Sequence, residues 1–222
     1  MQESDLRNQK IILASGSARR KEIFENHGLN PVVMPMDVDE TLADGIAPQD
    51  AVMYLALKKG LAAEQALTGE QRSSTLTDEQ HALIISADTI VYAKDVTTGE
   101  WTIMGKPKDE EDAWRMLRSI ASGKHKVMTG VAMINCCVNT ESESDFTPIR
   151  RVFFDSTDVF VKPMSDDEIR EYVESGEPFG KAGGYAIQME FGKYIDHIEG
   201  DYWNVVGFPF DHLEREMNLY CK

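Results

Sequence analysis

Apolar runs of strand length alternate with helix-like patterns along the chain, and this alternation limits the fold more than any other feature. The runs that predict strands are Lys10–Ala14, Ala82–Ala93, Lys126–Val138 and Arg151–Val161. A long helical pattern begins at Pro48 and runs to about Leu67, and Trp101–Met104 is expected to form a hairpin with the strand before it. Helices and hairpin-joined strands together indicate an α/β protein with a mixed sheet.

Cap signals predict where the shorter helices begin. Asp109 is expected to cap a helix that runs to Ile120, and Ser17 to cap a helix over Ala18–His27. A final helix is expected after Pro209.

Length and composition exclude several classes of protein. Of the 222 residues, 42% are hydrophobic and 27% charged, which is typical of a globular chain and excludes disorder or collagen. We expect a single domain over residues 1–222, with a polar leader at 1–9 and a catalytic domain at 10–222. No apolar run approaches the ~20 residues of a membrane span, and no secretion signal is recognisable, so no membrane partner is expected.

The chain is strongly acidic. Its 23 Lys and Arg against 38 Asp and Glu give a net charge of −15 at pH 7 with His neutral. Nucleic acid is therefore not an expected partner, because phosphate backbones are bound by Lys and Arg. Cys136, Cys137 and Cys221 have no CxxC spacing, and the first two are expected in the core rather than as ligands. This usage fits a reducing compartment, and we expect a cytoplasmic protein.

A tight turn between the first strand and the first helix has the sequence SGSARR (15–20). The free N–H groups at a helix N-terminus bind anions, and the Ser15 hydroxyl and the guanidinium groups of Arg19 and Arg20 would strengthen such a site. The turn therefore predicts a phosphate site. The alternative is an ordinary helix cap with solvated arginines.

Lys59 lies on the apolar face of the predicted 48–67 helix, whereas Lys58 does not. A lysine directed inward needs an anionic partner or a route to water. Snorkelling of its aliphatic stem is the alternative.

Asp88 interrupts the otherwise apolar or small run Leu83–Ile90. A carboxylate in such a strand costs stability unless it is partnered or useful. At a strand end it would bind a divalent cation or take a proton from water, and the alternative is an acid in a sharp turn. The carboxylates of Asp37, Asp39 and Glu40 would join it around a metal, or else form a solvated loop.

Two later loops carry lysines. Gly105-Lys106-Pro107 is not a P-loop, because a proline takes the place of the required hydroxyl residue. Lys181 lies in a glycine-rich loop that would close over a ligand or serve only as a connection. Gln188 carries both a donor and an acceptor and is equipped to read a base edge. The five histidines have no metal-ligand spacing and are interpreted as structural.

In their order and spacing these segments resemble the Maf family of nucleoside triphosphate pyrophosphatases, from Ile12 to about Leu213. The segments are LASGSARR (13–20), Asp39-Glu40, ALKK (56–59), SADTIV (86–91), GKP (105–107), SGKHKVMTG (122–130), GEPFGKAGGYAIQ (176–188) and GDYWNVVGFP (200–209). The resemblance implies an elongated, two-lobed α/β fold of the Maf/ITPase-like type, with a mixed central sheet, an interlobe cleft and a homodimer.

The resemblance also implies a reaction and a set of site residues. A nucleoside triphosphate would be split between its α and β phosphates into a monophosphate and pyrophosphate, with Mg²⁺ or Mn²⁺ as cofactor. Asp88 would be the general base and, with Glu40, a metal ligand. The residues expected to bind the substrate are Ser15, Arg19, Arg20, Lys59, Thr89, Lys106, Lys181 and Gln188.

Three of these positions indicate a substrate branch. Arg19, Thr89 and Gln188 match the family members that act on dTTP and UTP, whereas the branch that prefers 7-methyl-GTP has Trp, Gln and Glu there. We therefore expect hydrolysis of dTTP, UTP and modified pyrimidine nucleotides in a house-cleaning role. The alternative is a non-catalytic, nucleotide-binding regulator linked to cell division, which would have no need to keep Asp88 with Lys59.

The chain departs from the family pattern at three positions. Ala18 stands where proline is usual, Ser86 where glycine is usual, and Gly180 where aspartate is common.

Overall fold

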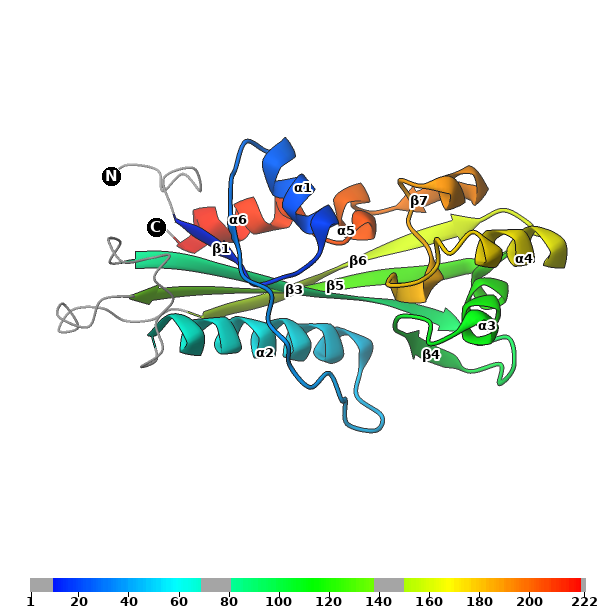
Figure 1. The fold of residues 1–222 in the computed structure, drawn as a ribbon, viewed down its shortest axis with the longest axis horizontal. Helices are drawn as coiled ribbons and strands as arrows, with labels where there is room; N and C mark the ends of the chain where they lie inside the picture. The colour runs from blue at the N-terminus through cyan, green and yellow to red at the C-terminus, as the bar shows by residue number, and fades with distance from the viewer. Residues whose placement is uncertain (1–9, 69–80, 138–149, 221–222) are drawn as a thin grey trace. The chain divides into compact units, whose positions relative to one another are not determined.

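The computed structural model describes residues 10–68, 81–137 and 150–220. The elements in chain order are β1 (Ile11–Leu13), α1 (Ala18–Asn26), β2 (Val32–Val33), α2 (Pro48–Thr68), β3 (His81–Lys94), β4 (Trp101–Met104), α3 (Glu110–Ile120), β5 (Lys124–Cys137), β6 (Arg150–Val161), α4 (Asp166–Glu174), the 3₁₀ helices η4 (Ala182–Gly184) and η5 (Glu190–Tyr194), β7 (Ile195–Glu199), α5 (Tyr202–Val206) and α6 (Phe210–Tyr220) (Figure 1). The expected α/β class is confirmed.

The seven strands of the described residues form one mixed sheet. Its order is β2-β1-β3-β5-β6-β7, and β4 pairs with β3 beside that path. Strand β1 is parallel to β2 and β3, whereas β4 is antiparallel to β3 and β7 is antiparallel to β6. The mixed sheet and the hairpin at Trp101–Met104 were both predicted from the sequence and are confirmed.

The chain divides into two compact units, each assembled from separate segments. Unit 1 contains Met1–Asp88, Gly130–Phe154 and Phe208–Lys222, and unit 2 contains Thr89–Thr129 and Asp155–Gly207. Strands β3, β5 and β6 each supply residues to both units. The expected two-lobed outline and interlobe cleft stay predictions.

In unit 1, helices cover both faces of the strands. On one side lies α2, where Ile12, Ile84 and Ile134 from three strands are fully buried together with Ala63 and Leu67 of the helix. Helices α1 and α6 lie on the other side (Figure 1). There the ring of Phe24 packs against those of Phe208 and Phe210, with centroids 4.9 and 5.5 Å apart.

Two glycines allow α2 to lie close against the sheet. A Cβ at Gly130 would stand 2.3 Å from the carbonyl group of Val52, and a Cβ at Gly60 would stand 2.8 Å from the Ser86 hydroxyl. That hydroxyl donates a hydrogen bond of 2.7 Å to the carbonyl of Ala56. Ser86 is therefore accommodated against α2, because the helix offers its side chain both space and an acceptor.

Unit 2 has its own core, formed chiefly by α3, α4 and the strands beside them. Its buried members include Leu117, Ile120, Ile169 and Phe191. The predicted cap of α3 is confirmed, because the side chain of Asp109 accepts a 2.8 Å hydrogen bond from a backbone N–H in the helix's first turn.

Some expectations fall outside the described part of the chain or concern membranes. The side chains of Cys136 and Cys137, and the whole of Cys221, lie outside the described residues. Among the helices that are described, none has both the length and the apolar character needed to cross a membrane.

Candidate active site

Three charged side chains singled out from the sequence meet in unit 1. The Lys59 ammonium lies 2.5 Å from Oδ1 of Asp88 and 2.7 Å from Oε1 of Glu40. The side chains of Lys59 and Asp88 are 11% and 13% exposed, whereas that of Glu40 is 46% exposed. The cluster therefore has a nearly buried ion pair at one end and a solvent-facing carboxylate at the other.

The local folding of α2 and β3 explains this meeting. Asp88 lies within β3 directly after two small residues, and not in a sharp turn, so that alternative is excluded. Lys59 projects from α2 toward the sheet beside Gly60, the point at which the helix lies close to the strand. Lys58 is instead 30% exposed, and its ammonium lies 2.5 Å from the Asp39 carbonyl oxygen. The predicted difference between the two lysines is confirmed.

Arg20 brings a second cation to the same unit. Its Nη1 donates to the carbonyl of Ala87 at 2.9 Å and to the Ser15 hydroxyl at 3.1 Å. The pKa of Arg20 is lowered to about 10, chiefly by burial. The charges of Asp88 and Glu40 oppose this decrease, and the charge of Arg19 adds to it. The guanidinium is therefore charged at neutral pH and is held next to the strand that carries Asp88.

The N-terminus of α1 is open at its cap. Ser17 is the N-cap residue, as predicted, although its side chain makes no capping hydrogen bond. Its backbone N–H instead donates to the Ser15 hydroxyl at 3.3 Å. Arg19 is half-buried, and burial lowers its pKa against the opposing charge of Glu22. The first-turn N–H groups of α1 are thus not capped by Ser17 and suit an anion.

Thr89 begins unit 2 and joins a chain of polar contacts there. Its hydroxyl lies 2.9 Å from that of Thr129 and 3.4 Å from the Gly207 carbonyl oxygen. Thr129 in turn bonds to the carbonyl of Asn204 at 3.3 Å, and the Asn204 amide donates to the Thr157 hydroxyl at 2.9 Å. Sequence reasoning assigned no role to Thr129 or Asn204. The available signal was a buried polar residue inside each of two apolar segments.

The two lysine-bearing loops of unit 2 are joined by their backbones. The N–H of Gly183 donates to the Gly105 carbonyl at 2.9 Å, which links the loop of Lys181 to the loop of Lys106. Gly183 has φ +65°, and a Cβ there would lie 2.5 Å from a methyl group of Val91, so only glycine fits. Lys106 is exposed, whereas Lys181 is half-buried and donates to the Glu177 carbonyl.

Gln188 and Gly180 complete the predicted positions in unit 2. The side chain of Gln188 is exposed and lies two residues before η5. Gly180 has φ +75°, a left-handed conformation that glycine adopts freely and that Asp adopts more readily than most residues. The backbone at position 180 is therefore one that either of these two residue types can adopt. The convergence of Arg19, Thr89 and Gln188 on one base stays a prediction.

The carboxylates of unit 1 fit a divalent cation only as a pair. No group of three or more His, Cys, Asp or Glu side chains converges anywhere in residues 10–68, 81–137 and 150–220. Asp39 does not join Glu40, because its Oδ1 accepts hydrogen bonds from the backbone and hydroxyl of Thr41 at 3.0 and 2.6 Å. Glu40 and Asp88 nevertheless direct one oxygen each at a single cationic group. Mg²⁺ is commonly held by one or two carboxylates, with substrate phosphates and water supplying the remaining ligands.

Comparison with known proteins identifies the family. The family model described as Maf-like protein matches residues 10–219. The chain belongs to the Maf family. A protein of Caldicellulosiruptor saccharolyticus named dTTP/UTP pyrophosphatase is 38% identical to this Maf chain over 205 residues, which are 92% of either chain. A Bacillus cereus protein of the same name is 37% identical over 212 residues, 96% of either chain.

Among solved structures, the Ham1 protein of Staphylococcus aureus aligns with this Maf chain at a TM-score of 0.46 and 15% identity. The alignment covers 94% of this chain and 100% of that one.

Proposed function

We propose that this Maf protein is a nucleoside triphosphate pyrophosphatase that converts dTTP and UTP to their monophosphates and pyrophosphate. The observation that carries the proposal is the ammonium of Lys59 between Asp88 and Glu40, with the Arg20 guanidinium anchored beside them. The names of relatives that align over more than nine-tenths of the chain support the same reaction.

Asp88 is the group best placed to act on water. Its carboxylate is largely shielded from solvent, stands in a strand and uses Oδ1 to bind Lys59. In the proposed reaction Asp88 accepts the proton of the water that attacks the α-phosphorus, and the bond to the bridging oxygen of the pyrophosphate breaks. A positioned carboxylate contributes about 10²–10⁴-fold as a general base.

Lys59, Arg20 and the N-terminus of α1 supply the positive potential for the phosphates. Both side chains are fixed by hydrogen bonds before substrate arrives, so little reorganisation is needed when charge develops in the transition state. The Ser15 hydroxyl already accepts from Arg20 and helps to hold the guanidinium in place. In unit 2, Lys106 and Lys181 are proposed to contact the same substrate.

A divalent cation is part of the proposal, and the charge balance of the cluster supports it. Lys59 and Arg20 are offset by Asp88 and Glu40, so these four groups leave no net positive charge for a triphosphate that carries several negative charges. Mg²⁺ or Mn²⁺ held by Glu40 and Asp88 would supply that charge and polarise the phosphoryl oxygens.

Base selection is assigned to Arg19, Thr89 and Gln188. Gln188 can donate and accept at once, which suits the alternating acceptors and N–H of uracil and thymine. Action on modified pyrimidine nucleotides, a house-cleaning role, one domain over residues 1–222, a homodimer and a cytoplasmic location are further parts of the proposal.

The alternative function, a regulator of cell division that binds a nucleotide without hydrolysing it, is not favoured. A site that only binds a nucleotide needs cations for the phosphates but has no use for a general base, which is the role proposed for Asp88. Removing the Asp88 carboxylate and the Lys59 ammonium from water is costly unless the arrangement serves a purpose.

The proposal is tested by incubating the purified protein with dTTP, UTP, dCTP, ATP, GTP and 7-methyl-GTP, with Mg²⁺, with Mn²⁺ and with EDTA. We expect monophosphate and pyrophosphate in equal amounts from dTTP and UTP, and no turnover in EDTA. Release of inorganic phosphate as the first product, or binding of dTTP without turnover in either metal, would refute the assignment.

A further inference from the structure

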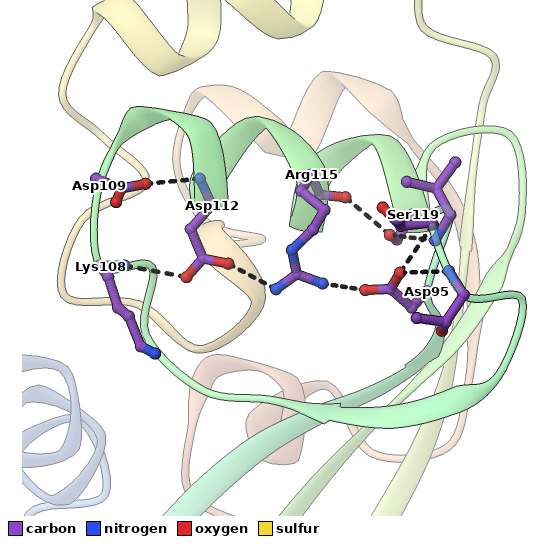
Figure 2. A network of polar contacts seen from close by, with 9 residues as sticks. Asp95, Lys108, Asp109, Asp112, Arg115 and Ser119 are labelled. Carbon is purple, nitrogen blue, oxygen red and sulfur yellow. Dashed lines mark hydrogen bonds and ion pairs between the residues drawn. The ribbon is translucent and has the colours of Figure 1, made fainter.

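A chain of polar contacts in unit 2 links the tip of the β3–β4 hairpin to the loop that carries Lys106. At its centre the Arg115 guanidinium bonds with Nη1 to the carboxylate of Asp95 and with Nη2 to Oδ1 of Asp112, the latter at 2.6 Å. The other oxygen of Asp112 accepts the backbone N–H of Lys108 at 3.1 Å. Figure 2 shows these groups in line along α3.

The hairpin end of this chain of polar contacts is fixed in place. The side chain of Asp95 is only 5% exposed, and its Oδ1 accepts the backbone N–H groups of Thr97 and Thr98 at 2.8 and 3.1 Å. Ser119 adds a second link, because its hydroxyl accepts the Val96 N–H at 2.9 Å and donates to the Arg115 carbonyl at 2.8 Å. Arg115 therefore projects from a helix that is held to the hairpin at two points.

The charged groups in this chain of polar contacts keep their charges around neutral pH. Burial tends to raise the pKa of Asp112, but its bonds to Arg115 and to the Lys108 N–H outweigh that effect and lower the pKa overall. The bond to Asp112 raises the pKa of Arg115 despite partial burial, and the charge of Asp95 adds to the increase. Asp112 and Arg115 thus stay ionised over the range in which an enzyme of this kind would be assayed.

The Lys106 loop is held at both ends. At one end the Gly105 carbonyl accepts the N–H of Gly183, and at the other end Asp112 accepts the N–H of Lys108. Between these two anchors Pro107 is buried and has a restricted φ. Lys106 is exposed, so its side chain projects from a short backbone segment whose position is set on both sides.

We propose that Arg115 and Asp112 are positioning residues for Lys106, and that they set the location of its ammonium through the Lys108 N–H. The proposal rests on the proposed function, in which Lys106 contacts the substrate phosphates. A displacement of about 1 Å in a positioning contact costs up to 10²-fold in rate, so loosening one anchor has a measurable effect. Neither Arg115 nor Asp112 touches the substrate in this account.

The test is a double-mutant cycle between Arg115→Met and Lys106→Ala. We expect Arg115→Met to lower kcat/KM for dTTP about tenfold in the wild-type background and less than about twofold in the Lys106→Ala background, because the loop then holds no ammonium to position. Arg170→Met is the matched control, since Arg170 makes a 2.7 Å ion pair with Asp167 at the same i, i+3 spacing on α4. It should leave kcat/KM within about twofold. Equal losses in both backgrounds, or no loss at all, would overturn the proposal.

A milder variant guards against misfolding. In Asp112→Asn the amide has a single acceptor oxygen, which the charged Arg115 guanidinium binds more strongly than the Lys108 N–H does, so the link to Lys108 breaks while size is kept. Backbone amide exchange then gives a readout that needs no activity. The Lys108 N–H should exchange at least about tenfold faster in Arg115→Met and Asp112→Asn than in Arg170→Met.

This measurement separates the two proposals. Faster Lys108 exchange in a protein that turns over no nucleotide would refute the proposed function and leave the loop anchor standing. Unchanged exchange would refute the anchor whatever the activity.

Discussion

Lys59 on α2 and Asp88 in β3 form an ion pair of 2.5 Å between side chains that are each less than one-seventh exposed. The same ammonium reaches Glu40 at 2.7 Å, so one cation holds two carboxylates that would otherwise repel each other. Asp88 and Lys59 can each be removed by a substitution that has a matched control nearby.

The first prediction concerns Asp88. Asp88→Asn keeps the size of the side chain and removes its ability to take a proton, so kcat for dTTP should fall at least ~10²-fold in saturating Mg²⁺. The control is Asp39→Asn, because Asp39 faces Thr41 rather than Lys59. We expect the control to stay within about threefold of wild type and both variants to keep the wild-type circular dichroism spectrum. Turnover by Asp88→Asn within a few-fold of wild type would exclude it as the base.

The second prediction compares the adjacent lysines of α2. Lys59→Met should lose ~2–4 kcal/mol of transition-state stabilisation, or ~30- to 1,000-fold in kcat/KM, because a preorganised cation is removed. Lys58→Met should change kcat/KM by less than about threefold, since Lys58 is partly exposed and binds a backbone carbonyl. Steady-state kinetics of both variants decide the point, and equal losses would show that the ammonium of Lys59 has no special part in the reaction.

The third prediction concerns the choice of base. The wild type should prefer dTTP and UTP to ATP by at least ~10-fold in kcat/KM, the equivalent of one net hydrogen bond. Gln188→Glu removes the donor of the side chain and should reduce activity on dTTP and UTP more than it weakens inhibition by inorganic triphosphate. Gln65→Glu, on the exposed surface of α2, controls for the added charge. If 7-methyl-GTP is the best substrate of the wild type, the assignment of the three positions is wrong.

The fourth prediction concerns stability and pH. His125 is fully buried in unit 2, its Nε2 lies 2.7 Å from the Tyr185 hydroxyl, and burial lowers its pKa to about 3 against the opposing charge of Asp158. An unfolded histidine titrates near 6.5, so between pH 6.5 and 3 the unfolded state binds a proton that the folded state does not. The stabilising contribution of neutral His125 is therefore complete above pH 6.5 and is lost as pH falls, by up to ~1.4 kcal/mol per pH unit.

The measurement compares urea unfolding of wild type and His125→Gln from pH 7.5 to 4.5. Glutamine can still bond to Tyr185 but does not titrate. Above about pH 7 the difference in unfolding free energy between the two proteins should be constant. Below about pH 6.5 the wild type should lose stability relative to His125→Gln. Parallel curves over the whole range would show that His125 is protonated equally in both states.

Much of unit 1 could be predicted because its signals are local. The period of α2 identified Lys59 as the inward lysine, and the single acid in β3 identified Asp88. Signals of this kind depend on spacing within one element. Strand β2 and helix α5 were not predicted, because two and five residues are too short to show a period.

The contacts that the sequence could not reveal join elements that are distant in the chain. Thr129 meets the backbone of Asn204 across 75 positions, and Arg115 reaches Asp95 from the exposed side of α3. A polar residue in an apolar segment or on a helix surface indicates that a partner is needed, but not which one. Ser17 shows the converse, because its position favoured a cap while its side chain makes no capping bond.

The assembly of unit 1 from three separate chain segments has a consequence for synthesis on the ribosome. Phe24 on α1 packs on Phe208 and Phe210, which emerge only after nearly every other residue has been made. The usual order, in which N-terminal parts fold first, is not open to this unit. Helix α1, and with it Arg20, has to wait for the last segment of the chain, so a ribosome stalled before Phe208 holds a polypeptide without a finished phosphate site. Truncation at the C-terminus should therefore abolish activity even though every proposed catalytic and binding residue remains.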